Sequence, residues 1–221
     1  MKVAIVGGTA GLGYGFALRL AAAGFTVAIG SRQADKAADA GRRVSENVPA
    51  SPAVGSGTNE EVVVGSDLVV VTVPYPGLVG IYESIKPHLS PGAVVLDCNV
   101  PLQSEVGGKA TRLIGVWEGS AAQQAKAILG KDFPVAAGFH TVMAALLQDL
   151  SRALDSDILV CGDQVAKDAV AEIVAKIEGA RFVDCGPLER ARLLEALAAL
   201  MIGINIRNKV DPGAGIRITG L

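Results

Sequence analysis

A glycine-rich segment follows directly on the first apolar run, Lys2–Val6, and reads Gly7-Gly8-Thr9-Ala10-Gly11-Leu12-Gly13. Glycines in such a turn allow positive φ angles and let the backbone approach a ligand closely. A helical pattern follows, and its N-terminal N–H groups could hold a phosphate. The order strand, glycine turn, helix therefore predicts a loop that binds the pyrophosphate of a dinucleotide. A strict GxGxxG pattern would have glycine at position 10, and the small side chain of Ala10 limits the effect of this difference.

The same glycines also fit a second motif. Gly7, Gly11 and Gly13 match the GxxxGxG pattern of short-chain dehydrogenases, and Tyr82 with Lys86 supplies a YxxxK pair. We reject this interpretation because that pair should lie beyond the middle of the sheet with a serine upstream. Tyr82 instead precedes the fifth expected strand, and a bare motif without its context is weak evidence.

The end of the second expected strand carries polar residues that could select the nucleotide. A site for NAD would have Asp or Glu there to bind the ribose hydroxyls. This chain has Ser31, Arg32 and Lys36, which offer a hydroxyl, a planar set of donors and a point charge. These groups suit a 2′-phosphate, so we expect NADP(H) rather than NAD. The alternative is a solvated basic helix start, which would oppose the helix dipole.

Three further loops are expected at the carboxyl ends of strands, where such sheets bind ligands. They provide apolar walls, prolines and one aromatic ring, but only one titratable group, His140. A carbonyl reductase would need an evident proton donor, whereas hydride transfer between two stacked rings needs mainly positioning and exclusion of water. The loops read Val73-Pro74-Tyr75-Pro76, Asn99-Val100-Pro101-Leu102 and Phe139-His140-Thr141-Val142.

The two histidines of the chain differ in their expected roles. His140 could act as an acid or base, contact a ring, or merely cap the helix that follows. His88 lies in a segment with Pro87 and Pro91 that resembles an exposed turn, and we expect no role for it.

These loops require strands and helices that position them. Short β-branched runs alternate with helical patterns up to residue 149, which predicts an α/β fold of Rossmann type, with a doubly wound parallel sheet. Runs such as Leu68–Val71 are apolar on both faces, as in strands covered by helices on either side. The expected strands are Lys2–Val6, Thr26–Ile29, Leu68–Thr72, Ala93–Leu96 and Val135–Gly138, with a weaker one at Ala53–Ser56, and the helices are Gly11–Ala23, Ala34–Ser45 and Gly119–Leu129.

The order of elements changes after residue 149. We expect a Rossmann domain over residues 1–149 and a small C-terminal α+β domain over residues 150–221, which closes the cofactor cleft. Its expected elements are strands Ile158–Cys161 and Arg181–Asp184 and helices Gln164–Ile177 and Leu188–Asn205. The last helix has an apolar face wider than so small a unit can cover. That face could pack on the first domain or form the interface of a homodimer.

Composition narrows the class of protein. The 221 residues include 20 basic and 22 acidic groups, so no charge imbalance indicates nucleic acid or a membrane surface as partner. No apolar stretch is long enough for a signal sequence or a membrane span. Cys98, Cys161 and Cys185 lack metal-ligand spacing, so we expect reduced thiols, no metal site and a cytoplasmic location. The expected partners are small-molecule cofactors.

Taken together, these residues make the chain similar to the NADPH-dependent reductases of coenzyme F420, an 8-hydroxy-5-deazaflavin. The similarity covers essentially the whole chain. It rests on Gly7-Gly8-Thr9 with Leu12-Gly13, Ser31-Arg32 with Lys36, Thr72-Val73-Pro74, Glu118-Gly119-Ser120-Ala121-Ala122, Phe139-His140-Thr141-Val142, Val160-Cys161-Gly162-Asp163, Asp184-Cys185-Gly186-Pro187-Leu188 and the last segment, residues 215–221.

The resemblance implies reversible hydride transfer between C4 of the nicotinamide and C5 of the deazaflavin. It implies His140 and Val142 as catalytic positions beside the stacked rings. Arg207, Lys209 and Arg217 are candidates for the acidic tail of the deazaflavin. The implied cofactor-binding residues are Gly8, Thr9, Ala10, Gly11 and Leu12 at the pyrophosphate, Ser31, Arg32 and Lys36 at the 2′-phosphate, Val73, Pro74, Tyr75, Val100 and Ala144 at the nicotinamide half, and Ala214 with Gly215 near the rings.

The sequence departs from the family pattern at Ala10, where relatives have glycine, and at Tyr75, where they can have tryptophan. Two other functions stay open: an NADPH-dependent reductase of another flat acceptor, such as a flavin or a metal chelate, and a non-enzymatic NADP(H) sensor.

Overall fold

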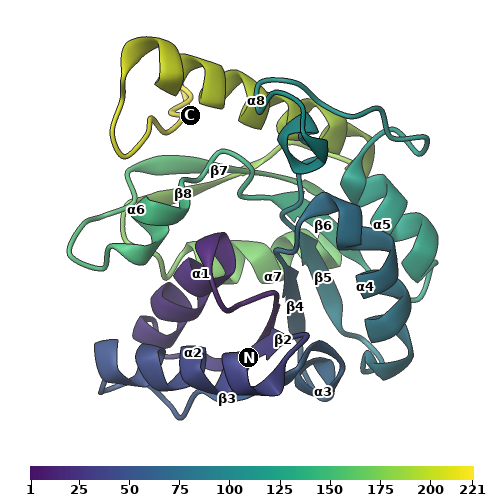
Figure 1. The fold of residues 1–221 in the computed structure, drawn as a ribbon, viewed down its shortest axis with the longest axis vertical. Coiled ribbons are helices and arrows are strands. Elements are labelled where there is room, and N and C mark those ends of the chain that lie inside the picture. Colours follow the sequence, from purple (N-terminus) through teal and green to yellow (C-terminus); the bar gives the residue numbers. More distant parts are fainter.

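Eight strands form one sheet in the computed structural model, which describes residues 1–221 (Figure 1). Their order across the sheet is β3-β2-β1-β4-β5-β6-β7-β8. The first six strands are parallel, β7 is antiparallel to β6, and β8 is parallel to β7. The bounds are β1 Lys2–Val6, β2 Thr26–Ser31, β3 Gly55–Thr58, β4 Leu68–Val71, β5 Val94–Asp97, β6 Val135–Gly138, β7 Ser156–Gly162 and β8 Ala180–Asp184.

The helices cover both faces of this sheet. They are α1 Gly11–Ala22, α2 Ala34–Asn47, α3 Asn59–Val63, α4 Leu78–Ile85, α5 Ala121–Leu129, α6 Ala144–Gln148, α7 Gln164–Val174 and α8 Ala191–Asn208. Short 3-10 turns occur at Tyr75–Gly77, Lys86–His88, Gln103–Val106 and Leu188–Arg190. The prediction of a doubly wound Rossmann sheet is confirmed.

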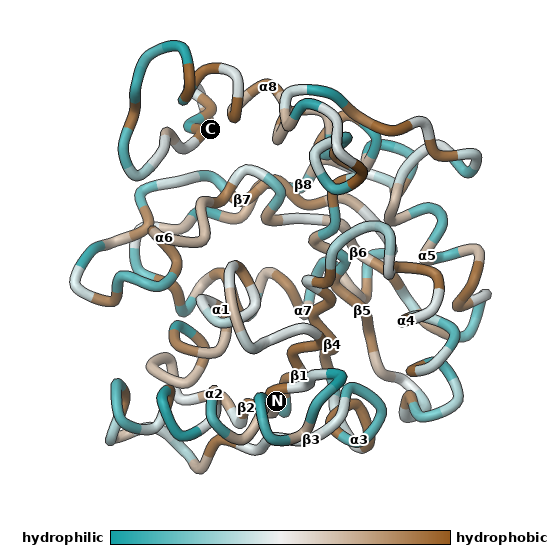
Figure 2. The backbone as a smooth tube through the Cα atoms, viewed as in Figure 1, coloured by the Kyte–Doolittle hydropathy of each residue, from teal (hydrophilic) through white to brown (hydrophobic).

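Alternate residues of the central strands belong to two different cores. Val3 and Ile5 of β1 pack with α1, α2 and α7, whereas Ala4 and Val6 pack with α3, α4 and α5. The same division holds along β4. Strands that are buried on both faces are continuous apolar runs, and Figure 2 shows the hydrophobic colour concentrated along β4 and β5.

The direction in which successive strands are added to the sheet reverses between β1 and β4, and this reversal places the glycine loop at the switch point of the sheet. From β1 the chain builds outward through β2 and β3, then returns to the other side of β1 as β4. The segments that follow β1 and β4 therefore lead to helices on opposite faces of the sheet, and open α/β sheets bind ligands at such a switch point.

The C-terminal part extends the same sheet. Strands β7 and β8 follow β6, α7 packs on the face that carries α1, and α8 packs on the opposite face with α5. In Figure 1 the chain leaves α8, turns back and ends near β7 and β8. The division into residues 1–149 and 150–221 stays a prediction.

Sequence patterns located the long elements and missed the short ones. The weak strand expected at Ala53–Ser56 is β3, shifted by two residues, and the last helix starts at Ala191 after a 3-10 turn. The helices α3, α4 and α6 were not predicted, because segments of five to eight residues carry too few turns for a periodic pattern.

Candidate functional site

The glycine loop has the backbone that phosphate binding requires. Gly7 and Gly11 have φ angles of 79° and 56°, in the left-handed region. A Cβ atom at Gly13 would lie 2.5 Å from Thr72 Oγ1 and 2.7 Å from the carbonyl oxygen of Gly7, so only glycine fits there. The first residues of α1 are therefore held close against β1 and β4.

The N-terminus of α1 is open. Ala10 is the N-cap residue in extended conformation, and no side chain accepts from the first turn, which contains no acidic residue. The N–H groups that begin at Gly11 and Leu12 have no carbonyl partner in a helix, so they and the helix dipole are available to an anion. A Cβ atom at Gly11 would meet nothing within 4 Å, so the loop is open to its surroundings at this position.

Arg43 supports this loop from α2 and was not recognised in the sequence. Its Nη2 donates to the carbonyl oxygen of Thr9 at 3.2 Å, and its guanidinium lies 4.6 Å from the ring centroid of Tyr14. Asp39 pairs with the same guanidinium at 3.1 Å. Arg43 lies three turns into a helix, where no sequence spacing connects it to the glycine loop.

Ser31, Arg32 and Lys36 lie next to the glycine loop because Gly8 N donates to the carbonyl oxygen of Gly30 at 3.0 Å. Arg32 and Lys36 are exposed, and neither makes an ion pair. Ser31 Oγ accepts from Gln33 N at 3.2 Å and closes the turn into α2. Two cations without partners at this strand end are suited to a phosphate.

The loop after β4 contacts both the glycine loop and α5. A Cβ atom at Gly7 would lie 3.0 Å from Val73 Cγ1, so these residues touch. Pro74 is exposed, and Tyr75 is the first residue of a 3-10 turn. The backbone N–H of Tyr75 donates to Glu105 Oε2 at 2.6 Å. The Tyr75 hydroxyl donates to Gln124 Oε1 at 3.2 Å. This ring is therefore fixed at both ends.

A buried polar network lies below the loop after β5. The Tyr82 hydroxyl donates to Asp97 Oδ2 at 2.6 Å, and the side chain and backbone N–H groups of Asn99 donate to the same carboxylate. Burial raises the pKa of Asp97 to about 6. Asn99 Oδ1 is buried and has no partner, so it is an acceptor available to a ligand amide beside the half-buried Val100.

His140 follows β6, directly after Phe139, which has a positive φ of 64°. Both imidazole nitrogens are buried and have no hydrogen-bond partner. Burial lowers the pKa of His140 to about 4, so the ring is neutral at physiological pH. A neutral ring with two unpaired nitrogens can donate one hydrogen bond and accept another, and it is a weak acid or base near pH 7. This geometry does not cap the following helix.

The segment after His140 meets the C-terminal segment. A Cβ atom at Gly213 would lie 2.5 Å from Met143 Cγ, so the backbone at Gly213 packs closely against the Met143 side chain. Ala214 N donates to Asn205 Oδ1 of α8 at 2.9 Å, and Asn205 Nδ2 lies 4.0 Å from Met143 Sδ. The partly buried Val142 immediately precedes Met143 in the chain, so it lies next to this contact.

Helix α6 connects the two halves of the site. It begins at Ala144, and Gln148 Nε2 at its end donates to the carbonyl oxygen of Gly11 at 2.7 Å. Arg19 of α1 donates to the carbonyl oxygens of Leu146 and Leu147 at 2.9 and 3.0 Å. The spacing along the chain gave no sign of these contacts, which span more than 125 residues.

One tail-binding candidate is already occupied. Arg217 pairs with Asp155 and Asp157 at 2.7 and 2.9 Å, so its charge is already paired within the chain. Arg207 and Lys209 are exposed and make no ion pair. The sequence could not indicate this pairing, because Asp155 and Asp157 face Arg217 only in the folded chain.

The residues fit a nicotinamide dinucleotide and a second flat ring. Open N–H groups lie at α1, unpaired cations lie at the end of β2, and the unpartnered polar atoms of Asn99 and His140 lie beyond β5 and β6. The fold and these features define a Rossmann-type dinucleotide-binding protein.

Comparison with known proteins identifies the family. Residues 2–101 match the family of F420-dependent NADP oxidoreductases. The chain is 42% identical to the F420-dependent NADP reductase of Methanothermobacter thermautotrophicus, over 100% of this chain and 96% of that protein. It is 38% identical to the reductase of the same description from Methanocaldococcus jannaschii, over 100% and 99% of the two chains. The chain belongs to the F420-dependent NADP reductase family.

Solved structures agree with this assignment. A crystal structure from Arthrobacter sp. FB24, described as an F420-dependent NADP reductase, superposes with a TM-score of 0.80 at 25% identity and covers 99% of this chain and 100% of that one. Glycerol-3-phosphate dehydrogenase of Coxiella burnetii shares the fold, with a TM-score of 0.60 at 18% identity over 85% of this chain and 54% of that one. None of the helices has the length and apolar character needed to cross a membrane.

Proposed function

We propose that this protein is an oxidoreductase that transfers a hydride reversibly between NADP(H) and coenzyme F420. Membership of the F420-dependent NADP reductase family supports this function. The observation that carries the cofactor preference is the pair of unpartnered cations, Arg32 and Lys36, beside an uncapped glycine loop. Bound together, the two cofactors supply the hydride donor and acceptor, and one proton from solvent completes the reduction of the deazaflavin.

The protein's own contribution is binding, orientation and exclusion of water. The pyrophosphate binds at residues 8–12, and Ser31, Arg32 and Lys36 hold the 2′-phosphate. Val73, Pro74, Tyr75, Val100 and Ala144 form the nicotinamide side, and Asn99 Oδ1 accepts from the carboxamide. The open helix end, the fixed Tyr75 ring and the unpaired acceptor described above support these assignments, and the family resemblance implies all of them except that of Asn99.

On the other side of the site, His140, Val142 and the backbone at Ala214 and Gly215 contact the deazaflavin. The buried nitrogens of His140 support a role as a hydrogen-bond partner of the ring, because its pKa of about 4 leaves it neutral. Residues 150–221 form the small domain that closes the cleft over the stacked rings. Their contact with Met143 supports this arrangement.

The test of this function is the absorbance of oxidised F420 mixed with the purified protein and NADPH. Parallel reactions contain NADH in place of NADPH, and FMN in place of F420. We expect bleaching of F420 with NADPH only. Bleaching of FMN alone would favour another flat acceptor, and tight NADPH binding without any reduction would favour a sensor.

We also propose that the protein is a cytoplasmic homodimer whose subunits join through α8. Leu193, Leu200 and Ile206 of this helix are 49%, 57% and 68% exposed. A hollow of about 620 Å³ lies between α8 and the segment around Leu113, and a second copy could fill it. Sedimentation of the native chain and of Leu200→Glu tests this: we expect a dimer that the substitution converts to a monomer.

A further inference from the structure

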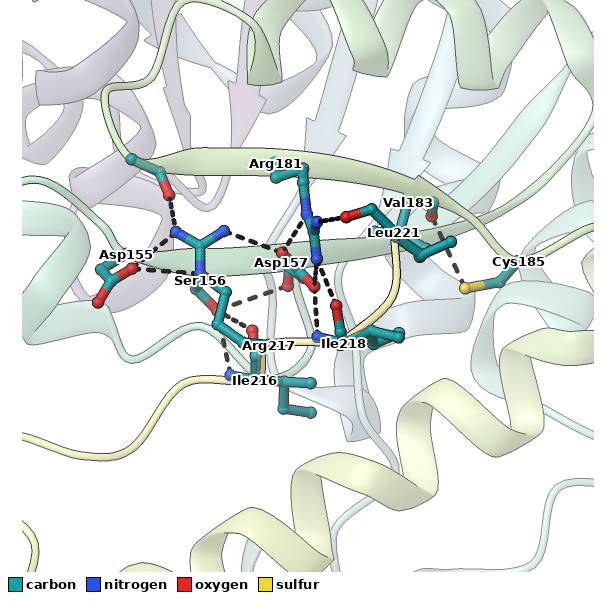
Figure 3. A network of polar contacts seen from close by, with 11 residues as sticks. Asp155, Ser156, Asp157, Arg181, Val183, Cys185, Ile216, Arg217, Ile218 and Leu221 are labelled. Atoms are coloured by element: carbon teal, nitrogen blue, oxygen red, sulfur yellow. Dashed lines mark hydrogen bonds and ion pairs between the residues drawn. The ribbon is translucent and has the colours of Figure 1, made fainter.

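The C-terminal segment is tied to β7 and β8 by a dense set of polar contacts (Figure 3). Asp157 N of β7 donates to the carbonyl oxygen of Ile216 at 2.7 Å, and Ser156 Oγ accepts from Ile216 N at 3.3 Å. Ile218 N donates to Asp157 Oδ2 at 2.7 Å. Residues 216–218 therefore lie along β7 but depend largely on side chains for their position.

Asp157 is the centre of this network. Its side chain is fully buried and accepts from Arg181 Nε and Nη2 at 2.8 and 2.6 Å and from Arg217 Nη1 at 2.9 Å. With the N–H of Ile218, the carboxylate receives four hydrogen bonds, three of them from cations. These contacts hold the pKa of Asp157 far below its usual range, so the group is charged at neutral pH.

The two arginines extend the contacts to both ends of the segment. Arg181 donates to the carbonyl oxygens of Ile218 and Leu221 at 2.7 and 2.6 Å. Arg217 donates to Asp155 at 2.7 Å and to the carbonyl oxygen of Gly179 at 2.9 Å. One buried carboxylate thus orients two guanidinium groups, and these hold the last residues of the chain against the sheet.

The stretch just before these contacts is held at its other end by α8. Asn205 Oδ1 accepts from Ala214 N at 2.9 Å, and Gly213 lies against Met143. Between the two anchors, the carbonyl of Ala214 and the N–H of Gly215 make no hydrogen bond within the chain. Free backbone groups on a segment fixed at both ends can bind a flat polar ring with little loss of entropy.

We propose that Asp157 is a positioning residue for the deazaflavin side of the site: it fixes residues 216–218 and thereby sets the position of the free backbone groups at Ala214 and Gly215. This inference rests on the proposed function. It predicts that the affinity for F420 depends on a carboxylate that touches neither cofactor, whereas the affinity for NADPH does not.

The test substitution is Asp157→Asn, which keeps the size of the side chain and removes its charge. The amide directs donors toward guanidinium groups that are themselves donors, and Arg181 and Arg217 then repel each other without a shared counter-charge. Asp168→Asn is the matched control, because Asp168 is exposed on α7 and contacts only Gln164.

For Asp157→Asn we expect the KM for F420 to rise about tenfold or more, because a small misplacement of a binding group has large kinetic effects. The KM for NADPH should change less than about twofold, which is within the usual effect of a distant surface substitution. Amide hydrogen exchange of residues 214–218, measured without cofactors, should become faster. Asp168→Asn should change none of these quantities.

Arg181→Lys provides a second variant that keeps the charge and loses the forked geometry. It should give the same pattern with a smaller rise in the KM for F420, about three- to tenfold, because the retained charge still pairs with Asp157. A merely structural role would lower the yield of folded protein and leave the ratio of the two KM values unchanged.

Two results would contradict the proposal, and they are distinguishable. Faster exchange of residues 214–218 in Asp157→Asn with an unchanged KM for F420 overturns the positioning role alone. Failure of the native chain to reduce F420 overturns the proposed function and this inference with it.

Discussion

Gln148 Nε2 donates to the carbonyl oxygen of Gly11 at 2.7 Å, across 137 positions of the chain. The bond uses the carbonyl of the glycine loop and leaves its N–H groups free for phosphate. It also fixes the end of the helix that begins at Ala144, on the expected nicotinamide side. The glycine loop that we propose to bind the pyrophosphate is therefore joined directly to a helix on the proposed nicotinamide side.

Substitution Gln148→Leu tests this connection. It removes one neutral hydrogen bond, which corresponds to about a two- to tenfold loss of affinity for NADPH. The KM for F420 should not change, because Gln148 makes no hydrogen bond to residues 213–218. Isothermal calorimetry with NADPH and steady-state kinetics with F420 provide the two measurements, and an equal effect on both cofactors would contradict the prediction.

Arg32→Ala should raise the KM for NADPH about ten- to a hundredfold, which corresponds to one or two hydrogen bonds to a charged group. The KM for NADH should change little, because NADH has no 2′-phosphate. Arg42→Ala is the matched control on α2, since Arg42 is exposed and pairs with Asp39 and Glu46 of its own helix. A parallel loss with both nucleotides would show that Arg32 does not bind the 2′-phosphate.

Gly13→Ala should destabilise the protein and weaken binding of both nucleotides. The new Cβ would lie 2.5 Å from Thr72 Oγ1 and 2.7 Å from the carbonyl oxygen of Gly7, so α1 must move away from the sheet. We expect a loss of about 1–3 kcal/mol in the free energy of unfolding, as for other overpacked sites. Gly24→Asn is a control at a left-handed position with open space around it, and urea titration measures both variants.

His140→Ala should lower F420 reduction without changing the shape of the pH profile between about pH 5.5 and 8. Burial lowers the pKa of His140 to about 4, so the native ring is already neutral throughout this range. The loss should be a rise of about tenfold in the KM for F420, as expected for one or two neutral hydrogen bonds. Disappearance of one limb of the pH profile would instead identify His140 as an acid or base.

Glu195 should make the protein less stable as the pH rises from about 6.5 to 8. Its carboxylate accepts from Ala121 N and Ala122 N at 3.0 and 3.2 Å, but burial raises its pKa from an ordinary 4.5 to about 8. The folded state then holds a proton that the unfolded chain releases. This stabilisation is complete below the unfolded pKa and is lost as the pH rises through 8, by up to about 1.4 kcal/mol per pH unit.

The variant Glu195→Gln should abolish that decline, and urea titrations at pH 6.5 and 8 measure it. Two other buried groups titrate below this interval and do not interfere. The raised pKa of Asp97, about 6, causes a loss of stability between 3.8 and 6, and the lowered pKa of His140 causes a gain between about 4 and 6.5. The same slope in the variant would contradict the role of Glu195.

The sequence predicted the sheet and the nucleotide loop because their determinants are local. Val3 to Val6 form a run that is apolar on both faces, as a buried strand requires. Only glycine fits at position 13, where α1 lies close against the sheet. Composition and spacing alone therefore indicate both features. Contacts made by long side chains across the fold have no such local pattern. Arg43 on the glycine loop and Asp157 below the C-terminal segment belong to this second kind.

Short elements and unpaired polar atoms were also beyond sequence analysis. Helix α6 has five residues, too few for a helical period to be recognised, although it carries Ala144. Asn99 was noted only as part of a loop, because its free Oδ1 becomes apparent only when Asp97 is seen to accept both of its N–H groups. The ion pair of Arg217 with Asp157 was likewise not predictable, because it forms only when β7 lies beside the last residues of the chain.

Direct hydride transfer between the two cofactors is tested by following a deuterium label in the reaction of the native chain. NADPH carrying deuterium on either face of C4 is mixed with F420 in ordinary water, and the product is analysed for deuterium at C5 of the deazaflavin. Direct hydride transfer between two rings held in one site predicts full retention of the label from one face and none from the other. Reduced deazaflavin that contains only solvent hydrogen at C5 would contradict it.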